Sequence, residues 1–292
     1  VTPTFVKVDL KDPVATSRAI EAHKEASGVI HFAAHKAVGE SVQKPLMYYT
    51  NNFYSLLNIL QSQSEHAINN FIFSSSATVY GTPETLPITE ENETKRPFSS
   101  YGNTKKIAEE ILDDFTKSNT HFSAISLRYF NPIGAHESGL IGELPNGVPN
   151  NLMPYITQTA AGVRDKLMVY GNDYPTKDGT PIRDYIHVVD LARAHVIAII
   201  RLINKEQEQS LEFFNLGTGL GYSVLDVINT FESVTDTKLN YEITKRRDGD
   251  VPQLYASTYL AKEKLGWSAE RELEDMIRSS WTWEQNLRNE QN

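Results

Sequence analysis

Apolar residues recur along this chain in two alternating patterns: short, nearly continuous runs, and longer stretches with the three-to-four spacing of a helix face. The short runs predict strands at residues 4–8, 28–34, 71–75, 122–127, 167–170, 212–216 and 240–244. The longer stretches predict helices at residues 13–26, 45–66, 99–115, 151–163, 188–203, 223–234, 258–265 and 273–287. Strands that alternate with helices predict an α/β protein whose parallel sheet is covered on both faces.

One predicted helix carries a pair of residues with a chemical use. Ser99 or Ser100 can cap its first turn, and Glu109 lies with other acidic residues away from its apolar face. Tyr101 and Lys105 are four residues apart, so they share one side of the helix. A neighbouring ammonium stabilises a phenolate, and a tyrosine in that state can take a proton from a sugar hydroxyl and return it. The alternative is an amphipathic helix without chemistry, because this spacing is common by chance.

A run of serines follows the predicted strand at residues 71–73. Ser74, Ser75 and Ser76 would stand at the carboxyl end of that strand, which is where ligands bind in open α/β sheets. A serine at this edge, followed by Tyr-x-x-x-Lys on the next helix, is typical of the short-chain dehydrogenases/reductases. The two features together are far more specific than either one alone.

Composition narrows the class of protein. The 292 residues include 28 Lys or Arg against 37 Asp or Glu, a net charge of −9, and this balance disfavours a surface for nucleic acid. There is no cysteine, which excludes disulfides, thiolate catalysis and cysteine–metal sites. No apolar run approaches the roughly 20 residues of a membrane span. We therefore expect a cytoplasmic enzyme with no membrane partner and no metal.

Several longer strings, in order, carry a family likeness that covers nearly the whole chain. They are the residues 31–33, 36–41, 73–81, 101–105, 128–132, 149–154 and 183–191. On these strings the chain resembles the extended short-chain dehydrogenases/reductases, and among them most closely the UDP-glucose 4-epimerases. The resemblance implies a Rossmann-like, doubly wound parallel sheet with a smaller, interleaved substrate domain. It assigns residues 1–130 and about 187–222 to an NAD-binding domain, and residues 131–186 and about 223–292 to a UDP-sugar-binding domain.

The same resemblance implies the interconversion of UDP-galactose and UDP-glucose by transient oxidation at sugar C4, with NAD retained through turnover. Tyr101 would remove the proton of the 4-hydroxyl, Ser76 would bond the 4-oxygen, and Lys105 would hold the nicotinamide ribose. Hydride would pass from C4 to the nicotinamide and return to the other face of the sugar. The protein supplies orientation and proton transfer, while the cofactor carries the redox step.

The remaining site residues also come from the resemblance. It implies NAD contacts at Asp9, Leu10, Phe32, Ala33, Lys36, Asn51, Ser74, Tyr101, Lys105, Tyr129 and Phe130. It implies UDP-sugar contacts at Lys36, Ser76, Tyr101, Asn131, Asn151, Leu152, Tyr170, Arg183, Arg247, Asp250 and Leu254. An arginine suits a diphosphate because its planar fork can bond two phosphate oxygens at once.

Some of these residues have simpler interpretations. Arg183 and Asp184 could be a surface ion pair of little energetic consequence. Asn131 could be a turn residue ahead of a proline. His35 and His187 have no nucleophile or metal-ligand pattern beside them, and we interpret both as structural.

The chain departs from the family pattern at two informative places. No glycine-rich motif for a pyrophosphate precedes Asp9, so we expect that the first βα unit is missing and that this chain binds NAD weakly or not at all. Leu254 stands where the family sets the size of the sugar pocket. Its intermediate size leaves UDP-N-acetylhexosamines open as substrates.

Other functions remain to be weighed. A nucleotide-sugar dehydratase or decarboxylase would need a carboxylate after the serine run, and Ala77 and Thr78 stand there instead. A UDP-glucuronate 4-epimerase needs no such carboxylate and stays open. So does a truncated relative that keeps only the fold. The resemblance also implies a homodimer that packs through the helices beginning near Pro45 and Tyr101.

Overall fold

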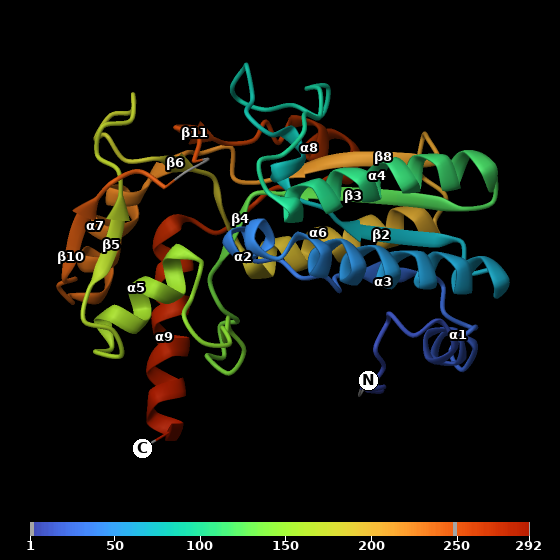
Figure 1. Ribbon diagram of the computed structural model, residues 1–292, viewed down its shortest axis with the longest axis horizontal. Coiled ribbons are helices and arrows are strands. Elements are labelled where there is room, and N and C mark those ends of the chain that lie inside the picture. Colours follow the sequence, from blue (N-terminus) through green and yellow to red (C-terminus); the bar gives the residue numbers. More distant parts are fainter. Residues whose placement is uncertain (1–2, 248–249, 292) are drawn as a thin grey trace. The chain divides into compact units, whose positions relative to one another are not determined.

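A four-stranded sheet forms the centre of the first part of the computed structural model, which describes residues 3–247 and 250–291. Its order is β1 (Val29–His31), β2 (Asn70–Ser74), β3 (Ser123–Tyr129) and β8 (Leu211–Leu216) (Figure 1). β2 runs parallel to both β1 and β3, with Ile30 opposite Ile72 and Ile72 opposite Ile125. The predicted α/β class and parallel sheet are confirmed.

Helices cover both faces of this sheet. Phe71 and Phe73 of β2 point to one face, where they pack with Leu56 of α3 (Pro45–Glu65) and Leu112 of α4 (Ser100–Ser118). Alternate side chains of a strand point to opposite faces. Ser74 therefore faces the other way, and there it meets α6 (Val188–Ile203). This arrangement is the doubly wound sheet that the sequence predicted.

Local capping explains where several helices begin. Asp12 accepts hydrogen bonds from the first amides of α1 (Pro13–Glu21), and Ser99 accepts one from the Gly102 amide in α4. Ser223 and Asp226 form a reciprocal capping box at the start of α7 (Val224–Thr235). Such caps satisfy amides that have no partner inside the helix. The capping role predicted for Ser99 is confirmed.

The predicted strand at residues 4–8 is wrong. No strand is formed there, and Phe5 is 88% exposed. An extended segment becomes a strand only when a neighbour pairs with its amides and carbonyls, and none of the described strands pairs with this one. Conversely, the short helices α2 (Val38–Gln43) and η1 (Ala77–Tyr80) were not predicted.

The second part of the chain is built on a parallel pair, β5 (Leu167–Tyr170) and β10 (Tyr241–Thr244). Met153 of α5 (Leu152–Ala160), Phe231 of α7 and Ile277 of α9 (Leu273–Gln291) bury an apolar core with β5. Short strands complete this part: β4 (Asn131–Ile133) pairs with β7 (Tyr185–His187), and β6 (Ile182–Arg183) lies between β9 (Tyr222–Ser223) and β11 (Gln253–Leu254). α8 (Tyr259–Leu265) follows them.

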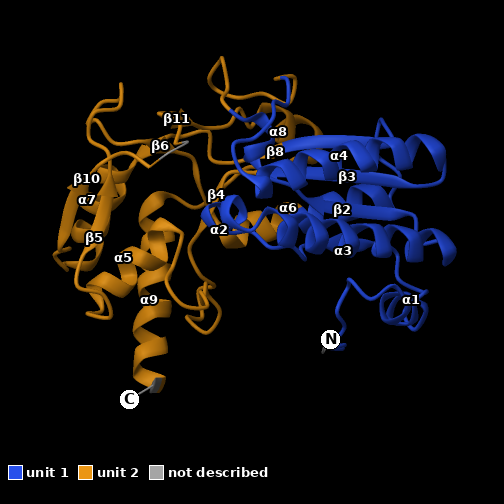
Figure 2. Ribbon diagram, in the orientation of Figure 1, with its two compact units in different colours: residues 1–81, 93–128, 195–214 blue, residues 82–92, 129–194, 215–292 orange. Residues whose placement is uncertain are grey.

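The chain divides into two compact units, coloured blue and orange in Figure 2. Unit 1 comprises Val1–Gly81, Glu93–Arg128 and His195–Phe214. Unit 2 comprises Thr82–Asn92, Tyr129–Ala194 and Asn215–Asn292. Each unit is described by itself below. The assignment of an NAD-binding and a UDP-sugar-binding domain stays a prediction.

Candidate active site

In unit 1 the first turn of α4 lies directly against the short helix after the serine run. A side chain at Gly102 would bring its Cβ within 2.7 Å of Pro97 and 3.2 Å of Thr78, so glycine is required for this close approach. Tyr101, beside it, is 8% exposed. The Ser76 hydroxyl accepts hydrogen bonds from the Thr78 amide (3.3 Å) and hydroxyl (3.0 Å). The serine run and the Tyr101 turn are thus neighbours, as predicted.

Lys105 is almost fully buried one turn further along α4. Its ammonium donates a 2.6 Å hydrogen bond to the main-chain carbonyl of Ser74 and lies 4.7 Å from the centre of the Phe73 ring. Burial lowers the pKa of Lys105 to about 8, although the nearby charge of Glu109 acts in the opposite direction. The ammonium is therefore tied to the carboxyl end of β2.

The side chain of Ser74 is held in place as well. Its hydroxyl lies 3.0 Å from Nε2 of His195, a buried residue on α6, and the Phe32 ring lies against that histidine with 4.6 Å between ring centres. No motif in the sequence singled out His195. Its only signal was a histidine on the apolar side of a helix, which is more often structural than functional.

Glu109 is 5% exposed, so its expected place away from the buried face of α4 is wrong. Its carboxylate accepts hydrogen bonds from Arg128 Nε (2.9 Å) and Nη2 (2.7 Å) and from the hydroxyls of Ser75 and Ser126 (both 2.7 Å). Arg128 also donates to the Tyr80 hydroxyl at 3.0 Å. Burial alone would lower the pKa of Arg128, but Glu109 raises it. A fully paired carboxylate is compatible with a buried position.

The loop after β1 holds three predicted cofactor residues, Phe32, Ala33 and Lys36, all of them exposed. Asn52 of α3 anchors this loop: its Oδ1 accepts from the His35 amide at 2.8 Å and its Nδ2 donates to the His35 carbonyl at 3.2 Å. The side chain of Asn51 donates to Asn52 Oδ1 at 3.1 Å, and its contact with NAD stays a prediction.

Asn52 reaches α4 as well. Its Nδ2 donates to Thr104 Oγ1 at 2.9 Å, and that hydroxyl donates to the Tyr101 carbonyl at 2.7 Å. A cavity of about 10 Å³ lies here, between the loop, α3 and α4. Its lining is formed by His31, Ala33, Ala34, Asn52, Phe73, Thr104, Lys105 and Ala108. Burial, with the Lys105 charge, lowers the pKa of His31 to about 3, so this histidine is neutral.

The two earliest predicted cofactor residues lie in an ordered turn ahead of α1. The Leu10 carbonyl accepts hydrogen bonds from the Thr16 hydroxyl (3.2 Å) and from Asn58 of α3 (2.8 Å). The Asp9 carboxylate accepts from the Lys11 amide at 3.0 Å and is exposed. No bond joins Asp9 to the Lys105 surroundings among the described contacts.

In unit 2 four predicted substrate residues come together. Arg183 of β6 lies opposite Leu254 of β11 in the parallel register, and its Nη2 lies 3.4 Å from Asp250 Oδ1. The Asn131 amide donates to the carbonyl of the neighbouring Asp184 at 3.0 Å, which brings Asn131 near the same strands. The sequence thus identified a cluster whose members are up to 123 residues apart.

Two consecutive arginines follow β10, and each stacks on a tyrosine at or just after the end of β5. The Arg247 guanidinium lies 4.6 Å from the Tyr170 ring centre, and Arg246 lies 4.2 Å from the Tyr174 ring centre. Arg246 also pairs with Asp173 at 2.6 Å. Arg247 and Tyr170 are both predicted substrate residues, and this contact brings them together.

Asp184 is fully buried, so the alternative of a surface pair with Arg183 is wrong. Its Oδ1 accepts from the Thr218 amide and hydroxyl, both at 2.8 Å, and its Oδ2 accepts from the amides of Gly219 (3.0 Å) and Ala256 (3.1 Å). Burial raises the pKa of Asp184, and these hydrogen bonds act against that rise. Asp184 therefore links the turn at residues 218–219 to Ala256, which follows β11.

The remaining predicted residues are more scattered. Asn151 precedes α5 and donates to Glu143 at 2.7 Å, while Leu152 begins that helix and packs on its core. Tyr129 ends β3, and the Phe130 amide donates to the Leu216 carbonyl at 3.1 Å. No described bond links Asn151 to the Arg183 cluster.

The two histidines that we interpreted as structural have such surroundings. His35 is held through its main chain by Asn52, and its ring lies 5.4 Å from that of Tyr48. His187 lies 3.1 Å from the Ser279 hydroxyl, and burial, with a smaller effect of Arg271, lowers its pKa to about 4. Their interpretation as structural residues stays a prediction.

Within residues 3–247 and 250–291, no group of three or more His, Cys, Asp or Glu side chains is arranged to hold a metal ion. Nor is any helix of this part long and apolar enough to cross a membrane.

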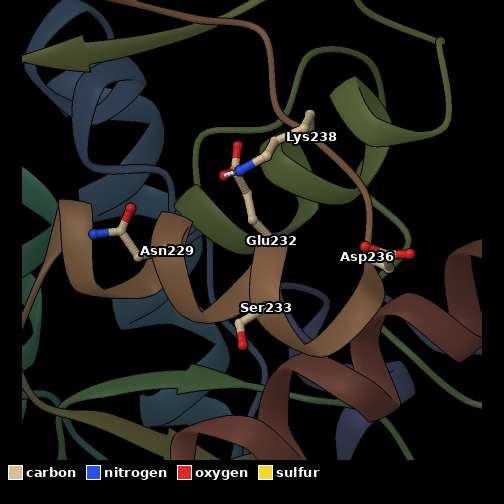
Figure 3. A pocket seen from close by; sticks show the side chains of 5 residues that line it. All are labelled: Asn229, Glu232, Ser233, Asp236 and Lys238. Carbon is tan, nitrogen blue, oxygen red and sulfur yellow. Dashed lines mark hydrogen bonds and ion pairs between the residues drawn. The ribbon is translucent and has the colours of Figure 1, made fainter.

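A surface hollow of about 310 Å³ lies beside α7. Figure 3 shows its five lining residues, Asn229, Glu232, Ser233, Asp236 and Lys238, with Glu232 and Lys238 paired across it. None of them is a predicted site residue. The hollow is therefore separate from the candidate site residues of unit 2 named above.

Known proteins resemble this chain over nearly all of its length. The family model of GDP-mannose 4,6 dehydratase matches residues 2–280. A UDP-glucose 4-epimerase of Drosophila melanogaster is 51% identical over 280 residues, which cover 96% of this chain and 79% of that protein.

Two solved structures agree with this. A UDP-glucose-4-epimerase from Stenotrophomonas maltophila, solved with NAD and formylated UDP-arabinopyranose, superposes with a TM-score of 0.94 at 42% identity, covering 99% of this chain and 84% of that one. A UDP-glucose 4-epimerase from Bifidobacterium longum, in complex with NAD⁺ and UDP, superposes with a TM-score of 0.91 at 46% identity. The match covers 97% of this chain and 83% of that one. The chain belongs to the UDP-glucose 4-epimerase family of the extended short-chain dehydrogenases/reductases.

Proposed function

We propose that this chain is an isomerase that interconverts UDP-galactose and UDP-glucose with NAD as its cofactor. The observation that carries the proposal is the joint placement of Tyr101, Lys105 and the serine run in unit 1. Curated relatives at about half identity are UDP-glucose 4-epimerases, and related structures contain NAD. A non-catalytic relative would have no need of a buried lysine tied to the end of β2.

The residues of unit 1 fit a dinucleotide on chemical grounds. The Lys105 ammonium has three N–H donors, and the hydrogen bond to the Ser74 carbonyl uses one of them. The others suit the hydroxyls of a ribose. The exposed Phe32 and the small Ala33 stand at the carboxyl end of β1, where a flat ring could approach.

Bound NAD would supply a hydride acceptor and donor for sugar C4. Tyr101 would take the proton of the 4-hydroxyl and return it, and Ser76 would orient the 4-oxygen. The Lys105 ammonium would stabilise the negative charge of the Tyr101 phenolate. These roles are those of proton transfer and positioning by the protein.

In unit 2 we propose that Arg183 and Arg247 bind the diphosphate of the UDP-sugar. The stacking of Arg247 on Tyr170 orients its guanidinium, which supports bidentate contact with phosphate oxygens. Asn131, Asn151, Leu152 and Asp250 are proposed as further contacts. Leu254, opposite Arg183, is proposed to set the tolerance for a 2-acetamido group.

The test is conversion of UDP-galactose to UDP-glucose by the purified chain, with and without added NAD. Tyr101→Phe should lower kcat on the order of 10²–10⁴-fold. Tyr155→Phe, which removes a phenol hydroxyl from α5, should leave kcat unchanged. An unchanged kcat in Tyr101→Phe would refute the proposed chemistry. UDP-N-acetylgalactosamine in the same assay distinguishes the wider-substrate alternative.

We also propose a homodimer and a cytoplasmic location. Leu46, Tyr54 and Leu57 form an exposed apolar stripe on α3, which supports packing against a second copy. Light scattering tests the dimer, and replacing Tyr54 and Leu57 by serine should give a monomer. A wild-type monomer at high concentration would contradict it.

A further inference from the structure

Glu109 joins three separate parts of unit 1 at one carboxylate. It lies on α4, one turn after Lys105. Its Oε1 accepts from Ser75, which follows β2, and from Ser126 and Arg128, which both lie on β3. Of these donors, only Ser75 belongs to the serine run.

Ser75 stands between the two serines that the proposed function uses. Ser74 on one side gives its carbonyl to Lys105, and Ser76 on the other is proposed to meet the sugar oxygen. The main chain of Ser75 is fixed to the sheet, because its amide donates to the Leu127 carbonyl at 2.9 Å. Its side chain is fixed to α4 by the 2.7 Å bond to Glu109.

We propose that Ser75 is a positioning residue, which holds Ser76 in place against the Tyr101 turn through its hydrogen bond to Glu109. This inference rests on the proposed function. Ser75 is fully buried and its hydroxyl is bonded to Glu109, so we assign it no catalytic role. It acts by limiting the freedom of the chain between Ser74 and Thr78, because the side chains of Ser74 and Ser75 are then both held by hydrogen bonds.

Removing the Ser75 hydroxyl does not leave Glu109 unpaired. Arg128 and Ser126 still donate to the carboxylate after a Ser75→Ala substitution. The variant loses one buried hydrogen bond between the serine run and α4, and it keeps the ion pair of Glu109 with Arg128. The variant should therefore fold.

Ser126 offers a matched control. It donates to the same Oε1 atom over the same 2.7 Å, and it is equally buried. It differs in its place, since it lies within β3 and not in the serine run. A purely structural role would make Ser75→Ala and Ser126→Ala equivalent.

The first measurement compares steady-state kinetics. Ser75→Ala should lower kcat about tenfold with KM for UDP-galactose within about twofold, since positioning acts on the transition state. Ser126→Ala should change kcat by less than about twofold, with a similar shift in thermal midpoint. Equal effects of the two variants on kcat would overturn the proposal.

The second measurement does not need activity. Amide hydrogen exchange in peptides covering residues 75–81 should be faster in Ser75→Ala than in Ser126→Ala, because only the first loosens this segment. Equal exchange in these peptides would overturn the positioning role. If the wild-type chain makes no UDP-glucose even with NAD, the proposed function fails, while the exchange comparison still decides whether Ser75 holds the segment.

Discussion

The side-chain ammonium of Lys105 is bonded to the main-chain carbonyl oxygen of Ser74 at 2.6 Å. The pair joins a helix to the end of the adjoining strand, and it does so with a charge in an almost fully buried position. A carbonyl dipole compensates a buried charge only in part. This explains why the pKa of Lys105 lies near 8 and not near 10.5.

This pKa has a measurable effect on stability. In the unfolded chain Lys105 keeps a pKa near 10.5, so between about pH 8 and 10.5 the unfolded state binds more protons than the folded state. The free energy of unfolding should therefore rise with pH across this window, by up to about 1.4 kcal/mol per pH unit. Below about pH 8 Lys105 is protonated in both states, so it adds no dependence of the unfolding free energy on pH.

Lys105→Met should remove that rise. Urea unfolding at several pH values from 7.5 to 10 measures the difference in slope between the variant and the wild type. Lys117→Met, at an exposed position on the same helix, is the control and should follow the wild type. Parallel curves for Lys105→Met and the wild type would contradict the lowered pKa.

Glu109 and Arg128 should show the energetics of a buried ion pair. Glu109→Leu leaves the Arg128 charge buried without a partner and should cost about 3–5 kcal/mol of unfolding free energy. Adding Arg128→Met should recover much of this loss, because no charge then remains in the site. Glu110→Leu, which removes an exposed partner of Lys106, is the control and should change little. A double variant less stable than Glu109→Leu would argue against this account.

Asn52 and Thr104 should be energetically coupled. A double-mutant cycle with Asn52→Leu and Thr104→Val should give a coupling of about 1 kcal/mol for their 2.9 Å hydrogen bond. Asn52→Leu should also weaken NAD binding, because the loop around His35 loses both of its hydrogen bonds to the Asn52 side chain. Calorimetry measures the affinity. Ser62→Ala, which removes a buried bond within α3, should leave NAD affinity as it was.

Asp184 should matter for the nucleotide through Arg183. Asp184→Asn places an amide group among four donors, so it should lose part of a network whose bonds to a charge are worth about 1.5–3 kcal/mol each. We expect weaker UDP binding in titration calorimetry, because β6 and the 217–219 turn lose their common anchor. Exposed Asp165→Asn is the control. Unchanged UDP affinity alongside lowered stability would limit Asp184 to folding.

Features encoded locally could be predicted from the sequence. The start of α4 follows from Pro97, the Ser99 cap and the apolar spacing after Tyr101, and the structure places the helix there. The same holds for β5 and α6, whose bounds coincide with the predicted ones. Tyr101, Lys105 and Ser76 were also found locally, because each sits in a short string of recognisable residue types.

The residues that depend on distant partners were missed. Glu109 has the sequence appearance of a solvated helix residue, and only Arg128, nineteen positions later, allows it to be buried. Asn52 and Asp184 bond main-chain groups, which leave no mark in a sequence. The predicted strand at residues 4–8 fails for the converse reason: its apolar alternation is present, but a strand needs a neighbour.

The strand β1 consists of three residues at one end of the sheet order, and no described strand pairs with its other edge. Beside it Phe32 is 58% exposed. A strand edge without a strand partner, next to an apolar ring, is a template for strand addition between molecules. Concentrated solutions of this chain should therefore aggregate with time through added β-structure, and a dye specific for cross-β assemblies would report it.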